Sequence, residues 1–482
     1  EVGDLGLELL HAHNSANVGE GRAQGGQLVG DIELDHVADQ TTVSPRRGPG
    51  AGSIAEMSTV GEPFRWRSIA LPALLPTILF SIGEGAIIPI IPTVADDLGA
   101  TLAIAGLVAA VLTIGELLGN IPSGWLIARI GERPAMIGAA SLSVIGLVIC
   151  LIAPNPLALG FGIFLVGLSA AVFALARHAF MTSFVPVAYR ARALSTLGGT
   201  FRLGYFVGPF ITAGVIQLTG TAGAAFWIHL VACAGAALVL VTLPDPTTTF
   251  GKVATVRLEG RQMREGEALV ARESSGLFRT LWASRGILSR LGTGAALVGA
   301  LRASRQVILP LWAVSIGVSA TNTALIIGIA GAVDFALFYF GGWIMDRYGR
   351  LASALPSMIG LGAGHLLLSF THDLPSNVAW FIAAAMVLSV ANGLGSGILM
   401  TLGSDLADKR NPAPFLGAWR FTAGVGGAAA PLLIAGITAI ASLAPAAAVM
   451  GVLGMLGAGV LARYVPRYIP RPPRAPRPGP NR

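Results

Sequence analysis

About twelve long apolar stretches divide this sequence, and they constrain its fold more than any other feature. Each approaches the roughly 20 residues that an α-helix needs to cross a bilayer. Their approximate ranges are 69–95, 102–124, 134–153, 156–181, 193–218, 223–243, 287–315, 321–345, 351–371, 375–401, 414–440 and 442–464. Only 12% of the residues are charged, whereas soluble domains carry roughly 25%. The pattern predicts an all-α membrane protein with twelve transmembrane helices.

Lysine and arginine occur only in every second loop between these stretches. Arg65 precedes the first stretch and Arg129 follows the second, while the opposite loops carry Asp96 and Asp373 instead. Basic loops remain on the cytoplasmic side of a membrane. We therefore expect a multi-pass protein of the cytoplasmic (plasma) membrane with both termini in the cytoplasm. The net charge of +7 follows from this topology and requires no nucleic-acid partner.

Three polar segments lie outside the apolar stretches. Residues 1–63 are predicted to be disordered, with Met57 as a candidate native start. Residues 244–286 are predicted to form a cytoplasmic linker, partly helical and lying on the inner membrane surface. Residues 466–482 are basic and proline-rich, which is typical of an extended cytoplasmic tail near anionic lipid headgroups.

One short motif occurs twice, as "GWLIARIGE" at 124–132 and "GWIMDRYGR" at 342–350. The copies are 218 residues apart, and the same offset relates Arg202 to Arg420 and Pro92 to Pro310. A single ungapped offset that matches distant regions indicates an internal repeat. We expect two pseudo-symmetric six-helix halves, 64–243 and 287–465. Such parallel repeats are typical of transporters that work by alternating access.

The second copy resembles the loop signature of the major facilitator superfamily: Gly, three residues, Asp, Arg, one residue, Gly, Arg. The resemblance implies the major facilitator fold, with this loop on the cytoplasmic side between the second and third helices of each half. The first copy departs from the signature at Ala128, where the family has Asp. The implied motif residues are Gly124, Arg129, Gly131, Gly342, Asp346, Arg347, Gly349 and Arg350.

The fifth stretch contains "GYFVGP", in which Gly204, Gly208 and Pro209 are similar to an element of the family's proton-coupled drug antiporters. This resemblance implies proton-coupled efflux. The antiporters also carry an arginine in the fourth helix, where this chain has Ile163.

Four charged residues in the stretches are related by the repeat and lie at similar depth: Glu116, Arg202, Asp334 and Arg420. A charged side chain inside a membrane needs a partner or a wet cavity. In the family fold the second helix packs on the eleventh and the fifth on the eighth, which implies the pairs Glu116–Arg420 and Arg202–Asp334. Such pairs would form an interdomain gate. The alternatives that remain open for these four residues are a purely structural network, proton coupling and substrate contact.

Glu84 and Arg302 also correspond at the 218-residue offset. The resemblance places the first and seventh helices along the central cavity, so these two side chains are expected to face each other. They either form a salt bridge or leave Glu84 as a substrate or proton site, because burial disfavours the charged form of a carboxyl group. Arg305 and Gln306 would add polar contacts from the seventh helix.

Three further polar residues are weaker candidates for a substrate or proton site. Arg177 and His178 either line the cavity or, in the case of Arg177, extend toward the membrane surface. Asn392 lines the cavity or forms a hydrogen bond between helices.

The sequence predicts a secondary active transporter that moves a small molecule by alternating access, by proton-coupled efflux; the alternative is an uptake permease. There is no Gly-x-x-x-x-Gly-Lys-Ser/Thr stretch for nucleotide binding. No cofactor or metal is expected, and a monomer is expected. An integral membrane enzyme would need clustered metal ligands or a nucleophile with its base, and a sensor on the same fold is a further rival.

Overall fold

The computed structural model describes residues 74–185, 187–243, 255–258, 261–274, 276–409 and 411–469. The predicted N-terminal segment 1–63, the candidate start Met57 and the part of the tail from residue 470 lie outside these ranges. Phe64–Arg482 form one compact unit of the chain.

The described residues are almost entirely helical, as the apolar stretches predict. The first half consists of α3 (Leu75–Ile87), η2 (Ile88–Ile90), α4 (Ile91–Asp97), α5 (Leu102–Ile130), α6 (Glu132–Leu151), α7 (Pro156–Phe184), α8 (Val187–Thr219), η3 (Ala222–Ala224) and α9 (Ala225–Thr242). The second half consists of η4 (Leu288–Gly292), α14 (Thr293–Ser315), α15 (Ala320–Tyr348), α16 (Arg350–Thr371), α17 (Asn377–Leu394), α18 (Ile398–Leu406), α19 (Ala413–Ile440) and α20 (Leu443–Tyr468).

Eleven helices among the described residues are long and apolar enough to cross a membrane. The seventh predicted span, α14, is not one of them, and it carries two charged residues, Arg302 and Arg305. The tenth span is one predicted helix that the structure divides, because Gly397 adopts a left-handed φ of 81° between α17 and α18.

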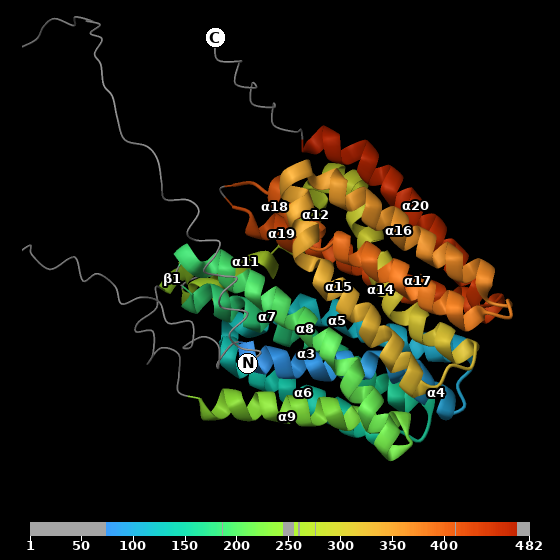
Figure 1. The fold of residues 1–482 in the computed structure, drawn as a ribbon. Coiled ribbons are helices and arrows are strands. Elements are labelled where there is room, and N and C mark those ends of the chain that lie inside the picture. Colours follow the sequence, from blue (N-terminus) through green and yellow to red (C-terminus); the bar gives the residue numbers. More distant parts are fainter. Residues whose placement is uncertain are drawn as a thin grey trace, which may run out of the picture. The chain divides into compact units, whose positions relative to one another are not determined.

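The two halves meet along two helix pairs. α8 packs on α15, and α5 packs on α19. In Figure 1 the blue-to-green helices of the first half lie beside the yellow-to-red helices of the second. The repeat exchanges these two helix pairs, so each interface is the pseudo-symmetric counterpart of the other.

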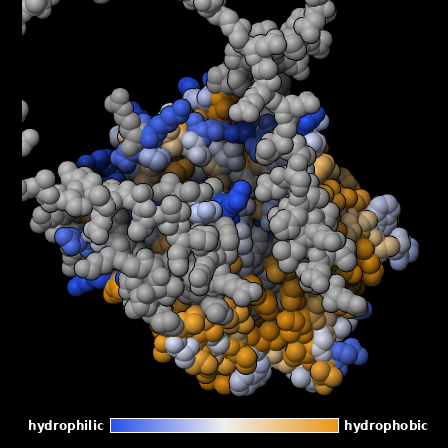
Figure 2. Space-filling model, turned by 60° about the vertical axis from the view of Figure 1, so that its left-hand side comes forward, coloured by the Kyte–Doolittle hydropathy of each residue, from blue (hydrophilic) through white to orange (hydrophobic). Residues whose placement is uncertain are grey.

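The outward faces of the helices are apolar. On α9, Trp227, Val231 and Leu238 are 56%, 65% and 62% exposed. Figure 2 shows hydrophobic side chains covering the lower part of the face in view, with hydrophilic side chains gathered above. Large exposed apolar faces on helices of this length are typical of contact with lipid.

The segment that joins the halves is partly helical among its described residues. It forms a hairpin of β1 (Thr255–Leu258) and β2 (Arg261–Arg264), followed by α11 (Glu265–Ser274), α12 (Leu277–Ala283) and α13 (Arg285–Ile287). α11 contacts α5 and α7 of the first half and α19 of the second. Two glycines permit this approach: a Cβ on Gly266 would collide with the Ala179 carbonyl, and one on Gly417 with the Glu273 carbonyl. The linker helix α11 therefore contacts both halves.

Candidate functional site

Residues of both halves line several cavities, and two adjoining ones carry most of the polar side chains. The first, of about 290 Å³, is termed the arginine cavity, and its polar lining is Arg202, Tyr205, Arg302, Arg305, Gln306, Asp334 and Asn392. The second, of about 260 Å³, is termed the glutamate cavity, and its polar lining is Glu84, Glu116, Asn120, Arg177, Tyr205 and Gln306. Phe201, Tyr205 and Gln306 line both cavities. The two cavities therefore adjoin at these three residues.

Asp334 on α15 is the centre of the polar contacts in the arginine cavity. Its carboxylate accepts from Arg202 at 3.3 Å, from Arg305 at 3.4 Å and from the Asn392 side-chain amide at 2.8 Å. Arg305 also donates to the Ser389 hydroxyl at 3.0 Å. The structure thus brings together Arg202 and Asp334, the pair that the repeat and the family fold imply. Asn392 both lines the cavity and bonds between helices, so its two sequence interpretations are compatible.

Arg302 does not face Glu84, and this corrects the expected pair. Its guanidinium donates to the Gly395 carbonyl at 2.6 Å, at the point where α17 ends. The charged groups that act on Arg302 are Arg202, Asp334 and Arg305. The broken tenth span accounts for the difference, because it brings the Gly395 carbonyl, which also accepts from the Ile398 amide at 3.2 Å, within reach of the arginine.

Glu84 instead belongs to the glutamate cavity, where it is 2% exposed. Its carboxyl group lies within hydrogen-bonding reach of the Tyr205 hydroxyl, and Arg177 is its neighbouring cation. The Arg177 guanidinium lies 4.6 Å from the centroid of the Phe201 ring. Arg177 therefore lines the cavity. His178 is half-buried on α7 and is not among the residues that line the described cavities.

The helix-five element holds Tyr205 against Glu84. A Cβ on Gly204 would collide with Ser81, and one on Gly208 would lie 2.5 Å from the Ile82 carbonyl oxygen. A Cβ on Gly85 would lie 2.8 Å from Cα of Tyr205. Without side chains at these positions α3 and α8 approach closely, and the phenol reaches the carboxyl group.

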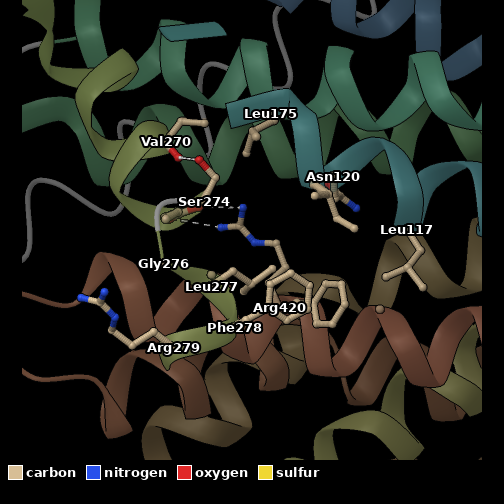
Figure 3. Close-up of a pocket in the computed structure, with 15 residues that line it drawn as sticks. Leu117, Asn120, Leu175, Val270, Ser274, Gly276, Leu277, Phe278, Arg279 and Arg420 are labelled. Carbon is tan, nitrogen blue, oxygen red and sulfur yellow. Dashed lines mark hydrogen bonds and ion pairs between the residues drawn. The ribbon is translucent and has the colours of Figure 1, made fainter. Parts of the chain in front are cut away.

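The predicted Glu116–Arg420 pair is not formed. Arg420 lies 3.0 Å from the carboxylate of Glu273 on α11, and Glu116 remains half-buried beside Glu84. Figure 3 shows the Arg420 side chain extending from α19 toward α11, with Leu117 and Asn120 of α5 opposite. The cause is the position of α11, which places a carboxylate nearer to Arg420 than Glu116. A cavity of about 360 Å³ lies at this point between α5, α19 and the linker.

Both copies of the loop motif form the same turn. Gly131 has a φ of 89° and Gly349 a φ of 94°, and each joins two long helices. Only glycine adopts such angles without strain. Arg129 lies over the Trp125 ring at 5.2 Å, and Arg347 lies over the Trp343 ring at 5.8 Å. The end of the helix bundle that carries Gly131 and Gly349 is termed the loop-motif end.

The two loop copies differ in the glycines that open them. A Cβ on Gly124 would meet the Ser274 side chain of α11, whereas nothing lies within 4 Å of a Cβ on Gly342. The two copies differ because the linker helix α11 packs against the first copy.

The last residue of each copy forms a different ion pair. Arg350 in the second copy lies 2.8 Å from Asp405 and 3.6 Å from Asp346. Glu132 occupies the equivalent place in the first copy and is fully buried. It accepts from the Ser183 hydroxyl at 2.5 Å and pairs with Arg264 of the linker hairpin at 2.8 Å.

Sequence reasoning missed Glu132, Arg264 and Glu273, the residues that dock the linker. One signal was available: the acid–base exchange between Glu132 and Arg350 at the 218-residue offset. No such signal marked Arg264 or Glu273, because the linker has no counterpart in the repeat.

Two acidic groups of the linker have altered acidity. Burial, together with the neighbouring Glu132 carboxylate, raises the pKa of Glu267 to about 7. Burial also raises the pKa of Glu273, and the adjacent Arg420 opposes that effect. Within the part of the chain that the structure describes, no group of three or more His, Cys, Asp or Glu side chains could hold a metal ion.

Comparisons with known proteins agree with this architecture. Residues 73–431 match the family described as Major Facilitator Superfamily, and residues 291–481 match it again. An uncharacterised MFS-type transporter of Mycobacterium tuberculosis is 24% identical over 318 residues, and the match covers 62% of this chain but only 45% of that protein. The gallate transporter of Pseudomonas putida is 29% identical over 133 residues, covering 27% of this chain and 29% of that protein.

Solved structures show the same fold at low identity. The xylose transporter of E. coli, in a partially occluded inward-open conformation, superposes with a TM-score of 0.62 at 15% identity, covering 83% of this chain and 98% of that one. A POT family transporter in complex with a thioalcohol-conjugated peptide gives a TM-score of 0.65 at 14% identity, covering 84% and 97%. On the family match over most of its length, this chain belongs to the Major Facilitator Superfamily.

Proposed function

We propose that this protein is a secondary active transporter that moves a small molecule across the cytoplasmic membrane by alternating access. The observation that carries the proposal is a charged cavity region lined by both halves. Arg202 and Asp334 reach it from opposite halves and bond to each other. A rocking motion of the halves would separate such a pair and expose the region to one side at a time. Because one chain supplies both walls, a monomer is sufficient.

The transport is coupled to protons, and Glu84 is the proposed proton carrier. It is a buried acid with a tyrosine and an arginine as neighbours. An ionised carboxylate in such a place needs its cation close by. When the halves rearrange and Arg177 moves, a proton is the alternative partner. Family membership supports the transporter class and excludes an enzyme.

The proposed direction is export, and the loop-motif end is proposed to face the cytoplasm. The alternating basic loops support that orientation, and the helix-five element supports proton exchange by its resemblance to antiporters. Uptake by the same cavity is the competing direction.

The test uses the full chain reconstituted in proteoliposomes with an imposed pH gradient. A panel of small anions, cations and neutral metabolites is scored for flux that depends on the gradient. Export by exchange predicts that substrate and protons move in opposite directions. Co-directional movement would replace export with uptake. If no compound shows a higher flux in vesicles with the unmodified chain than in vesicles with Glu84→Gln, proton-coupled transport is refuted.

A further inference from the structure

We propose that the arginine cavity is the subsite for the carboxylate group of an organic anion, whose apolar body contacts the aromatic walls beside it. This inference rests on the proposed function, because it names the class of substrate carried. It concerns Arg302, with which no carboxylate of the described residues forms an ion pair, and the neighbouring Arg305, which shares the Asp334 carboxylate with Arg202.

The arginine cavity has an excess of positive charge. Arg202, Arg302 and Arg305 line it, and Asp334 is the acid that faces them. Three donors from Arg202, Arg305 and Asn392 already occupy the Asp334 carboxylate. Among the described residues no carboxylate forms an ion pair with Arg302; its bonded partner is the Gly395 carbonyl. Uncompensated cations within a membrane protein mark ion and substrate pathways, and an anion would balance them.

Unused hydrogen-bonding groups lie on the same arginines. The Nε atoms of Arg302 and Arg305 are buried and have no hydrogen-bond partner among the described residues. Arg305 donates one N–H from each terminal nitrogen, to Ser389 and to Asp334, so a second N–H on each of these nitrogens is left besides Nε–H. Buried donors are normally satisfied, and a planar carboxylate matches the fork of a guanidinium. A carboxylate with two oxygens could accept from both arginines.

The walls of the cavity suit an apolar or aromatic body. Phe201, Tyr205 and Phe335 line it together with Leu309 and Ile327. Aromatic walls with a few convergent polar groups are typical of small-molecule sites. The cavity of about 290 Å³ adjoins the glutamate cavity at the shared Phe201 and Tyr205.

The glutamate cavity fixes the orientation of the anion. Two acids, Glu84 and Glu116, line this cavity, and Arg177 is the one cation in its lining. A carboxylate placed there would meet like charge, whereas in the arginine cavity it meets opposite charge. The charged group of the substrate is therefore directed toward α14, and its body toward Phe201.

The experiment measures binding to the purified full chain in detergent, with three aromatic acids as probes. Benzoate, phenylacetate and 3-phenylpropionate are each compared with the corresponding amide and amine by thermal shift and calorimetry. We expect at least one carboxylate to raise Tm in a dose-dependent manner while its amide and amine do not. Arg302→Gln and Arg305→Gln should weaken that binding at least tenfold. Arg463→Gln, which removes an exposed arginine on α20, is the matched control and should bind as the unmodified chain does.

A second readout needs no ligand. Because Arg302 has no acidic partner, Arg302→Gln should leave Tm of the free protein unchanged or raise it. Arg302→Gln also loses the hydrogen bond to the Gly395 carbonyl, so the comparison is with Arg302→Lys, which keeps the charge. A fall in Tm in Arg302→Gln that Arg302→Lys does not share would show that a carboxylate of the protein balances Arg302, and would overturn the inference. Arg302→Lys keeps the charge but not the fork, so it should bind the probe between the glutamine variant and the unmodified chain.

The outcomes separate this inference from the proposed function. Equal stabilisation by acids and amides, or unchanged binding in both arginine variants, overturns the carboxylate subsite even if proton-driven flux of another compound is found. Carboxylate binding that depends on Arg302 and Arg305, without flux under any pH gradient, supports the subsite and refutes the transport proposal.

Discussion

Asp334 holds charged side chains from both halves at once. It pairs with Arg202 of α8 and Arg305 of α14, each at under half exposure. Removing one member of a partly buried charge network strands the others in a low-dielectric region. The carboxylate is therefore expected to matter for stability as well as for motion.

Asp334→Asn should lower the free energy of unfolding by about 3 kcal/mol, because three arginines would then share no carboxylate in their cavity. Adding Arg202→Gln should recover part of that loss, since it removes one of the stranded charges. Denaturation in detergent, followed by tryptophan fluorescence, measures both variants. A double variant no more stable than Asp334→Asn would contradict the proposed coupling.

Glu84→Gln should abolish transport driven by a pH gradient while leaving exchange of labelled substrate across the membrane. The amide keeps the size of the side chain and its contact with Tyr205 but cannot exchange a proton. Tyr205→Phe is the companion variant, and it should reduce coupling less because the carboxyl group remains. Unchanged pH dependence in Glu84→Gln would remove this residue from the coupling site.

At the scale of elements, the contact of the linker helix α11 with both halves is the clearest feature that the sequence did not predict. The apolar stretches and the 218-residue offset predicted the helices and the repeated loop motif. The Arg202–Asp334 contact followed from the offset together with the helix packing that the family resemblance implies. α11 lies outside the repeat and is polar, with Glu265, Glu267 and Glu273 in ten residues. The polar sequence of such a segment predicts that it lies at the surface. The three-dimensional packing shows that α11 can approach the helices because Gly266 and Gly417 have no side chain.

Gly266→Ala should loosen α11, because the added methyl group would meet the Ala179 carbonyl. Hydrogen exchange of backbone amides in α11 is expected to accelerate at least about tenfold, equivalent to about 1.4 kcal/mol of local opening. Gly138→Ala on the exposed side of α6 is the control, since nothing lies within 4 Å of its added Cβ. Equal exchange in the two variants would show that α11 docks by other contacts.

Docking of the hairpin and α11 should weaken as pH rises. The pKa of Glu267 is raised to about 7 in the docked state, from an ordinary value of 4.5. The docked state therefore binds an additional proton between these values. Its contribution to docking is complete below about pH 4.5 and is lost as pH rises through about 7. The groups that face Glu267 are Glu132 and Arg264.

Exchange rates of α11, corrected for the intrinsic effect of pH, should rise between pH 5 and pH 7.5. Glu267→Gln should remove most of this dependence. A pH dependence that persists in full in the variant would assign the titration to another group.

At the scale of the whole molecule, helix contacts lie at both ends of the cavities. Toward the loop-motif end, a Cβ on Gly424 of α19 would lie 3.2 Å from Leu117 of α5. At the opposite end, near the start of α5, a Cβ on Gly106 would lie 3.1 Å from Leu311 of α14. Alternating access requires that these two contacts do not open together.

Cysteines introduced at Leu117 and Gly424 should form a disulfide that stops transport, because it fixes α5 to α19. Transport should return on reduction. The native Cys150 and Cys233 are buried and free, so each single-cysteine variant is a suitable background control. Full transport in the cross-linked protein would show that α5 and α19 do not separate during the cycle.

The position of α11 has a further consequence for how the loop-motif end opens. The segment that fills the space between the halves is also the chain that joins them, so its docking is intramolecular and its effective concentration is set by the tether. Effective concentrations for short tethers are of millimolar order. A free peptide copied from 261–283 would have to approach that level to compete, and diluting the protein would not release the segment. The opening equilibrium is thus a fixed property of each molecule, altered by mutation or pH but not by protein concentration.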